Sequence, residues 1–108
     1  MDKKSVTAVA RQQLKIASTA SSGRSSQTII GGHSHSLRQT VVALSAGQSL
    51  AEHDGTCDAT VYVLSGKLEL ISGANAWKGS AGDLIVVPST RHSVRAIEDV
   101  AFLLTVAK

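Results

Sequence analysis

The chain has very few of the large side chains that usually anchor a core or stack on a ligand. Its 108 residues include one tyrosine, one tryptophan and one phenylalanine, and proline and cysteine also occur once each. The hydrophobic content of 43% therefore comes mainly from Val, Ile, Leu and Ala, and β-branched residues favour strands. This composition is typical of one folded domain, not of a disordered chain.

Long hydrophobic runs and disulfide partners are missing too. No apolar run approaches the ~20 residues that span a bilayer, and no hydrophobic segment follows Lys3 and Lys4 as it would in a secretory signal. A single cysteine, Cys57, has no partner for an internal disulfide, which suits a reducing compartment. We therefore expect a cytoplasmic protein that does not associate with membranes.

The positive charge is concentrated in the first part of the chain. Residues 1–40 carry six basic residues and one acid, a net charge of +5, whereas residues 41–108 carry five bases and seven acids, a net charge of −2. Nucleic-acid interfaces combine clustered bases with aromatic side chains, and residues 1–40 contain no aromatic residue. We expect no nucleic-acid partner, and interpret the basic segment as a solvated surface or a match to an acidic partner subunit.

Residues 1–27 are predicted to form a helix followed by a linker. Ser5 is a suitable N-cap, and apolar residues recur at helical spacing over residues 6–17. A helix this short is marginal alone, so we expect it to dock on the rest of the protein. Residues 18–27 are rich in serine and contain Gly23, which is typical of a linker.

Residues 28–108 are predicted to form a β-domain. Roughly eight to ten short apolar runs are separated by glycine-containing turns about every 8–12 residues. This spacing is typical of a sandwich or a small barrel. The aliphatic residues that would face inward predict a small and fairly apolar pocket.

Two stretches of this domain share one pattern. In the first, five residues separate Gly47 from His53, and the apolar run 61–64 then leads to Gly66. In the second, five residues separate Gly82 from Pro88, and His92 follows. Each stretch combines a glycine turn, an apolar strand and one histidine.

These stretches resemble the paired motifs of the cupin superfamily. The first family motif has a glycine, five residues, His-x-His, and a glutamate seven residues before a closing glycine. The second has a glycine, five residues, a proline and, five residues after it, a histidine. The match covers residues 47–93. The resemblance implies an all-β fold, a double-stranded β-helix or jelly-roll barrel of the RmlC-like type, with the short N-terminal helix outside it.

The metal-ligand positions of that family agree less well. Its second histidine falls on Gly55 and its glutamate on Ala59, while His92 follows Pro88 by four residues where the family has five. Of the four ligands that the resemblance implies, His53 and His92 have counterparts. A metal centre needs about three protein ligands and an open position for substrate, so two histidines leave the site incomplete.

Other residues could complete a site for Fe, Ni, Zn, Mn or Cu, the metals that imidazole ligands would suit. His33 and His35 are alternate residues, and the thiolate of Cys57 is a soft ligand. The simpler interpretation makes the two histidines surface residues after a glycine turn and Cys57 a small buried apolar residue. A barrel without metal, in which His53 and His92 bond to each other, to Thr40 or to water, is equally open.

Small-molecule binding in the barrel is the first interpretation of function. The ligand-binding candidates are His53, His92, Arg91, Thr40 and Tyr62. Arg91 is included because a guanidinium pairs with planar anions and because it follows Pro88 in a loop. The alternatives are a metal-dependent enzyme of the dioxygenase, isomerase or decarboxylase type, which the resemblance implies, and a regulatory or structural module. Catalysis stays open, and no catalytic residue is identified.

A homodimer is expected because an open barrel leaves an edge strand and an apolar arm uncovered. The segments expected at the contact are the helix residues Val6, Val9 and Leu14 together with residues 29–30.

Overall fold

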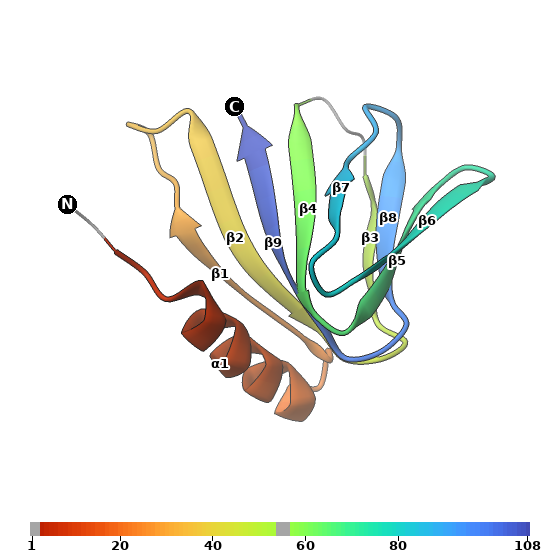
Figure 1. Cartoon of the computed structure of the whole chain (residues 1–108), viewed down its shortest axis with the longest axis horizontal. Helices are drawn as coiled ribbons and strands as arrows, with labels where there is room; N and C mark the ends of the chain where they lie inside the picture. The colour runs from red at the N-terminus through yellow and green to blue at the C-terminus, as the bar shows by residue number, and fades with distance from the viewer. Residues whose placement is uncertain (1–2, 54–56) are drawn as a thin grey trace.

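A computed structural model of the chain describes residues 3–53 and 57–108, with only the backbone at Glu52 and His53. Within these ranges one helix precedes nine strands (Figure 1). The elements are α1 (Val6–Thr19), β1 (Arg24–Ile30), β2 (Leu37–Leu44), β3 (Ser49–His53), β4 (Ala59–Ser65), β5 (Lys67–Ser72), β6 (Asn75–Ser80), β7 (Leu84–Val86), β8 (His92–Ala96) and β9 (Val100–Ala107). The expected all-β architecture with a short N-terminal helix is confirmed.

The strands form two antiparallel sheets with jelly-roll connections. The five-stranded sheet has the order β1-β2-β9-β4-β7, and the four-stranded sheet has the order β3-β8-β5-β6. In Figure 1 the strands converge at the lower end of the molecule and spread apart at the upper end. We call the lower end, with the turns around Gly47, Gly66 and Asp99, the closed end. The upper end, with residues 31–36, 87–91 and 107–108, is the open end.

The core lies between the sheets and follows the alternation that the strands predict. Every second residue of β2, β4, β5, β8 and β9 points inward, and these inward residues are buried except toward the ends of β2, β4 and β9, where they are half-buried or exposed. The buried cluster consists of Val42, Leu44, Val61, Val63, Leu68, Leu70, Val94, Ala96, Val100 and Phe102. Phe102 is the largest of these side chains and is fully buried. One aromatic residue and many aliphatic ones are therefore enough to fill this barrel.

The closed end depends on one glycine at a close approach of two turns. Gly66 has a φ of +81°, and a Cβ placed on it would lie 2.0 Å from the carbonyl oxygen of Asp99. No other residue fits there without moving the backbone. The carboxylate of Asp99 also accepts a hydrogen bond of 2.8 Å from the backbone N–H of Ala46. Three turns that are distant in the sequence are thereby held together.

Helix α1 is confirmed and packs on the outer face of the five-stranded sheet. The Ser5 hydroxyl caps it by accepting a hydrogen bond of 3.2 Å from the backbone N–H of Ala8. Ala10 and Ala17 are buried, which lets the helix approach β1, β2 and β9 closely. Across the residues the structure covers, no helix is both long and apolar enough to cross a membrane.

The linker after the helix is shorter than the serine-rich composition of residues 18–27 suggests. Residues 24–27 belong to β1, which pairs with β2 from Arg24 opposite Leu44. The buried side chain of Gln13 on α1 accepts a hydrogen bond from the Ser25 hydroxyl and donates one of 3.3 Å to Gln27. Polar side chains thus connect helix and strand here, and these tertiary contacts outweigh the low strand propensity of serine.

The apolar arm expected at a dimer contact is used within the chain. A small buried cluster that includes Val41 of the sheet is covered by Val6, Val9, Leu14 and Ile29. Three of the exposed apolar side chains lie together on the part of the sheet that α1 leaves uncovered. They are Tyr62 on β4 and Leu84 and Val86 on β7.

Candidate functional site at the open end

A cavity of about 350 Å³ opens on the inner face of the five-stranded sheet at the open end. Its described lining consists of Arg38, Thr40, Cys57, Leu104, Val106 and Lys108. Arg38 and Thr40 continue the inward-facing row of β2 beyond Val42, and Leu104 and Val106 continue the row of β9 beyond Phe102. The cavity is therefore the continuation of the core toward solvent.

The two strands contribute different chemistry to this cavity. Arg38 lies opposite Val106 in the antiparallel register, and Thr40 lies opposite Leu104. Strand β2 thus provides a polar row and β9 an apolar row. The Thr40 hydroxyl shares a hydrogen bond of 3.1 Å with the hydroxyl of Thr28 on β1. These placements put Thr40, a predicted ligand-binding residue, in the cavity wall.

Lys108 ties the end of β9 to the turn between β1 and β2. Its ammonium donates a hydrogen bond of 2.8 Å to the carbonyl oxygen of Gly32, and its backbone N–H donates one of 2.7 Å to Ser36. The rim of the cavity is therefore held by contacts between segments far apart in the sequence. Sequence reasoning missed Arg38 and Lys108 as site residues, although each extends an alternating inward row by one step.

His92 is buried on the inner face of β8, in the same row as Val94 and Ala96. Its Nδ1 lies 2.8 Å from the carbonyl oxygen of Thr90. A carbonyl oxygen only accepts, so Nδ1 carries a proton and Nε2 is the ring nitrogen suited to accept a hydrogen bond or bind a metal. The backbone of His53 pairs with that of His92, after a register shift in β3. The side chain of His53 lies outside the described residues.

Ser72 holds the loop that precedes His92. This buried serine shares a hydrogen bond of 2.6 Å with the Thr90 hydroxyl and donates one of 2.9 Å to the carbonyl oxygen of Arg91. The hydroxyl of Thr90 is thus one of the anchors of this loop. The sequence carries a signal for this role of Ser72, since it is a polar residue that continues the inward row of Leu68 and Leu70. A buried hydroxyl requires hydrogen-bond partners, so a polar residue at such a position predicts a polar contact inside the barrel.

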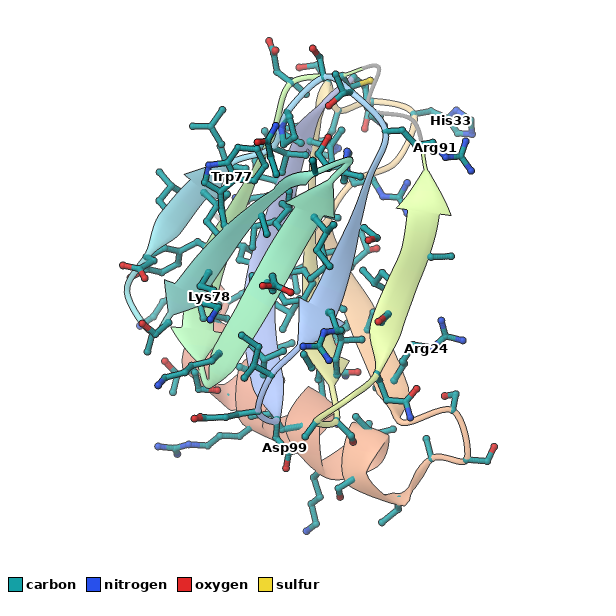
Figure 2. All side chains as sticks on the ribbon, turned by 90° about the vertical axis from the view of Figure 1, so that its right-hand side faces the viewer. Arg24, His33, Trp77, Lys78, Arg91 and Asp99 are labelled. Atoms are coloured by element: carbon teal, nitrogen blue, oxygen red, sulfur yellow. The ribbon has the colours of Figure 1, made fainter. Side chains whose placement is uncertain are left out.

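The other predicted ligand residues lie apart from the inner face. Arg91 is exposed at the open end (Figure 2), and its backbone carbonyl accepts a hydrogen bond from Ser72. Tyr62 is 41% exposed and lies opposite Leu84 and Leu103 on the outer face of the sheet. The structure therefore separates Tyr62 from His92 by the thickness of the sheet.

The proposed additional metal ligands are not gathered around His92. His33 and His35 are exposed in the turn between β1 and β2, where the Ser34 hydroxyl lies 3.3 Å from Nδ1 of His35. Cys57 is exposed and lines the cavity. Among the side chains that the structure describes, no three from His, Cys, Asp and Glu are grouped to hold a metal ion. Ala59 brings no ligand atom, and Gly55 lies outside the described residues.

A family model of the cupin domain matches residues 40–107, which include both histidine stretches, all of β9 and most of β2, but neither Arg38 nor Lys108. The chain belongs to the cupin domain family. No curated protein matches it. The family thus confirms the jelly-roll fold inferred from the glycine and proline spacings, while the ligand and activity need separate arguments.

Solved structures agree with this assignment. A conserved protein of unknown function from Streptococcus pyogenes is 30% identical, with a TM-score of 0.73, and the match covers 82% of this chain and 77% of that one. An RmlC-like cupin from Desulfovibrio desulfuricans is 26% identical, with a TM-score of 0.68 over 78% of this chain and 81% of that one.

A larger protein shares the fold as well. A mutant of salicylate 1,2-dioxygenase from Pseudoaminobacter salicylatoxidans is 20% identical with a TM-score of 0.74. The match covers 94% of this chain and 32% of the dioxygenase chain. At this identity the likeness shows a common fold.

Proposed function

We propose that this cupin binds a small molecule in the cavity at the open end of its barrel. The observation that carries the proposal is the lining of the cavity, in which the apolar row of Leu104 and Val106 lies beside the polar row of Arg38 and Thr40. Ligand sites typically combine such a wall with a few polar groups in roughly 300–1,000 Å³. A volume of about 350 Å³ suits a small ligand.

His92 adds a polar group to the barrel interior, although it is not among the described residues that line this cavity. A histidine buried among aliphatic side chains, with Nδ1 bonded to Thr90, presents Nε2 as a second hydrogen-bonding atom of the barrel interior. Burying an imidazole costs free energy, and the hydrogen bond from Nδ1 to the carbonyl oxygen of Thr90 offsets part of that cost. Polar groups that are buried despite this desolvation cost are typical of binding sites.

The proposal is tested by filling the cavity. Val106→Trp places a large side chain in the inner wall, whereas Ala107→Trp places the same side chain at the next residue, which is exposed. A panel of small metabolites is screened by thermal shift, with and without divalent metals, and positive compounds are measured by calorimetry. We expect binding to the wild type and to Ala107→Trp, and loss of binding in Val106→Trp. A panel without any shift, or equal binding by both variants, would refute the proposal.

A metal-dependent enzyme of the dioxygenase, isomerase or decarboxylase type is the second candidate. It is favoured by the buried His92 and by the backbone pairing of His53 with it. The described side chains alone do not supply the three ligands that a firm site needs, so we derive no catalytic step.

Elemental analysis of the untagged protein tests this candidate, after reconstitution with iron, nickel, zinc, manganese or copper. About one equivalent of metal in the wild type, and its loss in His92→Ala, would support it. Less than about 0.1 equivalent in the reconstituted wild type would rule it out.

We also propose a homodimer, formed through the uncovered face of β4 and β7. Leu84 and Val86 are 62% and 75% exposed, and Leu84 lies directly opposite Tyr62. Strand β7 is the last strand of its sheet, so a second copy related by a two-fold axis could pair with it and cover this face. A regulatory or structural partner would compete for the same face.

A cytoplasmic location is proposed as well. The single cysteine, Cys57, has no second cysteine in the chain to pair with, which is consistent with a reducing compartment.

A further inference from the structure

The two positive side chains of the cavity come from β2 and from the residue that follows the neighbouring strand β9. Arg38 on β2 lies opposite Val106, and Lys108 follows two residues later beside the end of β9. Both line the cavity. Diagonal positions of this kind on antiparallel strands are roughly 7–8 Å apart, which is within reach of long side chains. Two cations so close together repel each other, and an anion between them would remove that repulsion.

No acidic side chain among the described residues neutralises this pair. The described lining of the cavity contains no Asp or Glu. The ion pairs between residues of the described ranges lie elsewhere and join Lys67 to Glu98 and Arg95 to Glu69. The ammonium of Lys108 has three donors, and one is used on the carbonyl oxygen of Gly32. In the contacts between described residues, the other two donors of Lys108 and the five of Arg38 are available to a ligand.

The arrangement of the polar and apolar rows favours one orientation of a ligand in the cavity. Arg38 and Thr40 lie on β2, two residues apart on the inner face, so a planar anion can meet a guanidinium and a hydroxyl together. A guanidinium binds a carboxylate through two parallel hydrogen bonds. Across the register, Leu104 and Val106 form the apolar row on β9. A ligand that fits both rows carries its charge at one end and hydrocarbon at the other.

We infer that the cavity recognises a small monocarboxylate, with Arg38 and Lys108 holding the carboxylate and Leu104 and Val106 contacting an aliphatic or aromatic remainder. The inference rests on the proposed function and names its ligand class. A volume of about 350 Å³ is near the lower limit for ligand sites, which suits a short-chain or single-ring acid. Arg38 thus replaces Arg91 as the arginine expected to contact the anion, because Arg91 is not among the described residues that line the cavity.

Matched pairs of acids and amides test this inference. Benzoate and hexanoate are titrated by calorimetry beside benzamide and hexanamide, which have the same shape without the charge, and beside inorganic phosphate. We expect the wild type to bind at least one of the acids about 10-fold or more tightly than its amide. Arg38→Gln should remove this preference, leave amide binding unchanged, and leave the melting temperature unchanged because Arg38 is exposed.

Two control variants place the effect at the cavity. Arg91→Gln removes the other candidate arginine at the open end, and Arg11→Gln removes an exposed arginine on α1. Both should keep the preference for the acid. If acids and amides bind equally, or if phosphate binds more tightly than either acid, the carboxylate inference is wrong while the proposed function stands. If acids, amides and the wider panel all fail to bind, the proposed function itself fails. Loss of acid binding in Arg91→Gln but not in Arg38→Gln would also overturn the inference.

Discussion

The closed and open ends of the barrel differ in chemistry although the same strands run through both. At the closed end, tight turns meet backbone to backbone, as Gly66 and Asp99 do, and the core above them is fully apolar. At the open end, inward positions become polar and charged, ending in Arg38 on β2 and Lys108 beyond β9. Figure 2 shows Asp99 at the lower end and Arg91 and His33 at the upper end.

Strand β9 shows this change within a few residues. Val100 and Phe102 are fully buried, Leu104 is half-buried, and Lys108 is exposed. All four belong to the inward row. Burial of apolar surface at one end stabilises the fold, and the unfilled space at the other end leaves room for a ligand. The packed core and the proposed binding cavity are therefore separated along the barrel axis, which variants at each end can test.

The largest effect is expected at the closed end, in Gly66→Ala. The added Cβ would meet the Asp99 carbonyl oxygen at 2.0 Å, and φ is +81°. We expect loss of more than about 4 kcal/mol of unfolding free energy, or no folded protein. Gly73→Ala is the control, since Gly73 has a φ of +58° but no atom within 4 Å of the new Cβ. It should cost about 1 kcal/mol in urea unfolding. Equal costs for the two variants would contradict the close approach at Gly66.

The next effect compares two residues of β9 that share one face. Phe102→Ala removes a fully buried ring and should cost about 3–5 kcal/mol in chemical denaturation. Leu104→Ala removes a half-buried side chain beside the cavity and should cost about 1–2 kcal/mol. Leu104→Ala should weaken ligand binding as well. A similar cost at both positions would show that the core continues to the open end.

Ser72→Ala should have an intermediate effect and involve the open end directly. It leaves the Thr90 hydroxyl and the Arg91 carbonyl without this partner, so we expect a loss of about 1–3 kcal/mol. The NMR signals of the His92 ring should shift, because the loop before it loses its anchor. Ser89→Ala, at an exposed serine of the same loop, is the control and should change neither quantity. Unchanged His92 signals in Ser72→Ala would show that the loop holds its position without Ser72.

The smallest effect on stability is expected on the outer face, in Leu84→Glu. Leu84 is 62% exposed, so the change should stay within about 0.5 kcal/mol for the single chain. If two copies pair through this face, the mass in solution at micromolar concentration should fall from that of a dimer to that of a monomer. Ile16→Glu, on the exposed side of α1, is the control and should remain dimeric. A monomeric wild type would rule out the proposed dimer.

Sequence reasoning was most successful where the signal is local. The helix begins at the predicted cap because Ser5 can accept a bond from a residue three positions later. The alternating rows were readable because each strand has one buried face. The strand at residues 24–27 was missed, since its serines are stabilised by Gln13 of the helix and by pairing with β2. Contacts of that kind have no signature within the segment.

The candidate site was predicted only in part, for the same reason. His92 and Thr40 were expected at the barrel interior, and the structure places both on inward rows. Tyr62 was expected there too, but its parity on β4 sends it to the outer face. The arginine suggested by its position after Pro88 is exposed, whereas Arg38 lines the cavity. Alternation along a strand decides which face of the sheet a side chain lies on, and motif spacing alone does not show this.

From the sequence, glycine turns and alternating apolar residues predict a sandwich or small barrel through local geometry, and the resemblance of residues 47–93 to the cupin motifs implies a jelly roll. The sequence also showed that two of the four metal-ligand positions of its family hold Gly55 and Ala59. Only the tertiary structure decided which polar residues meet. Arg38 and Lys108 lie near opposite ends of the barrel sequence and share a cavity because β2 and β9 are neighbours in one sheet. Strand order arises from packing over the whole chain, and so does this pairing of charges.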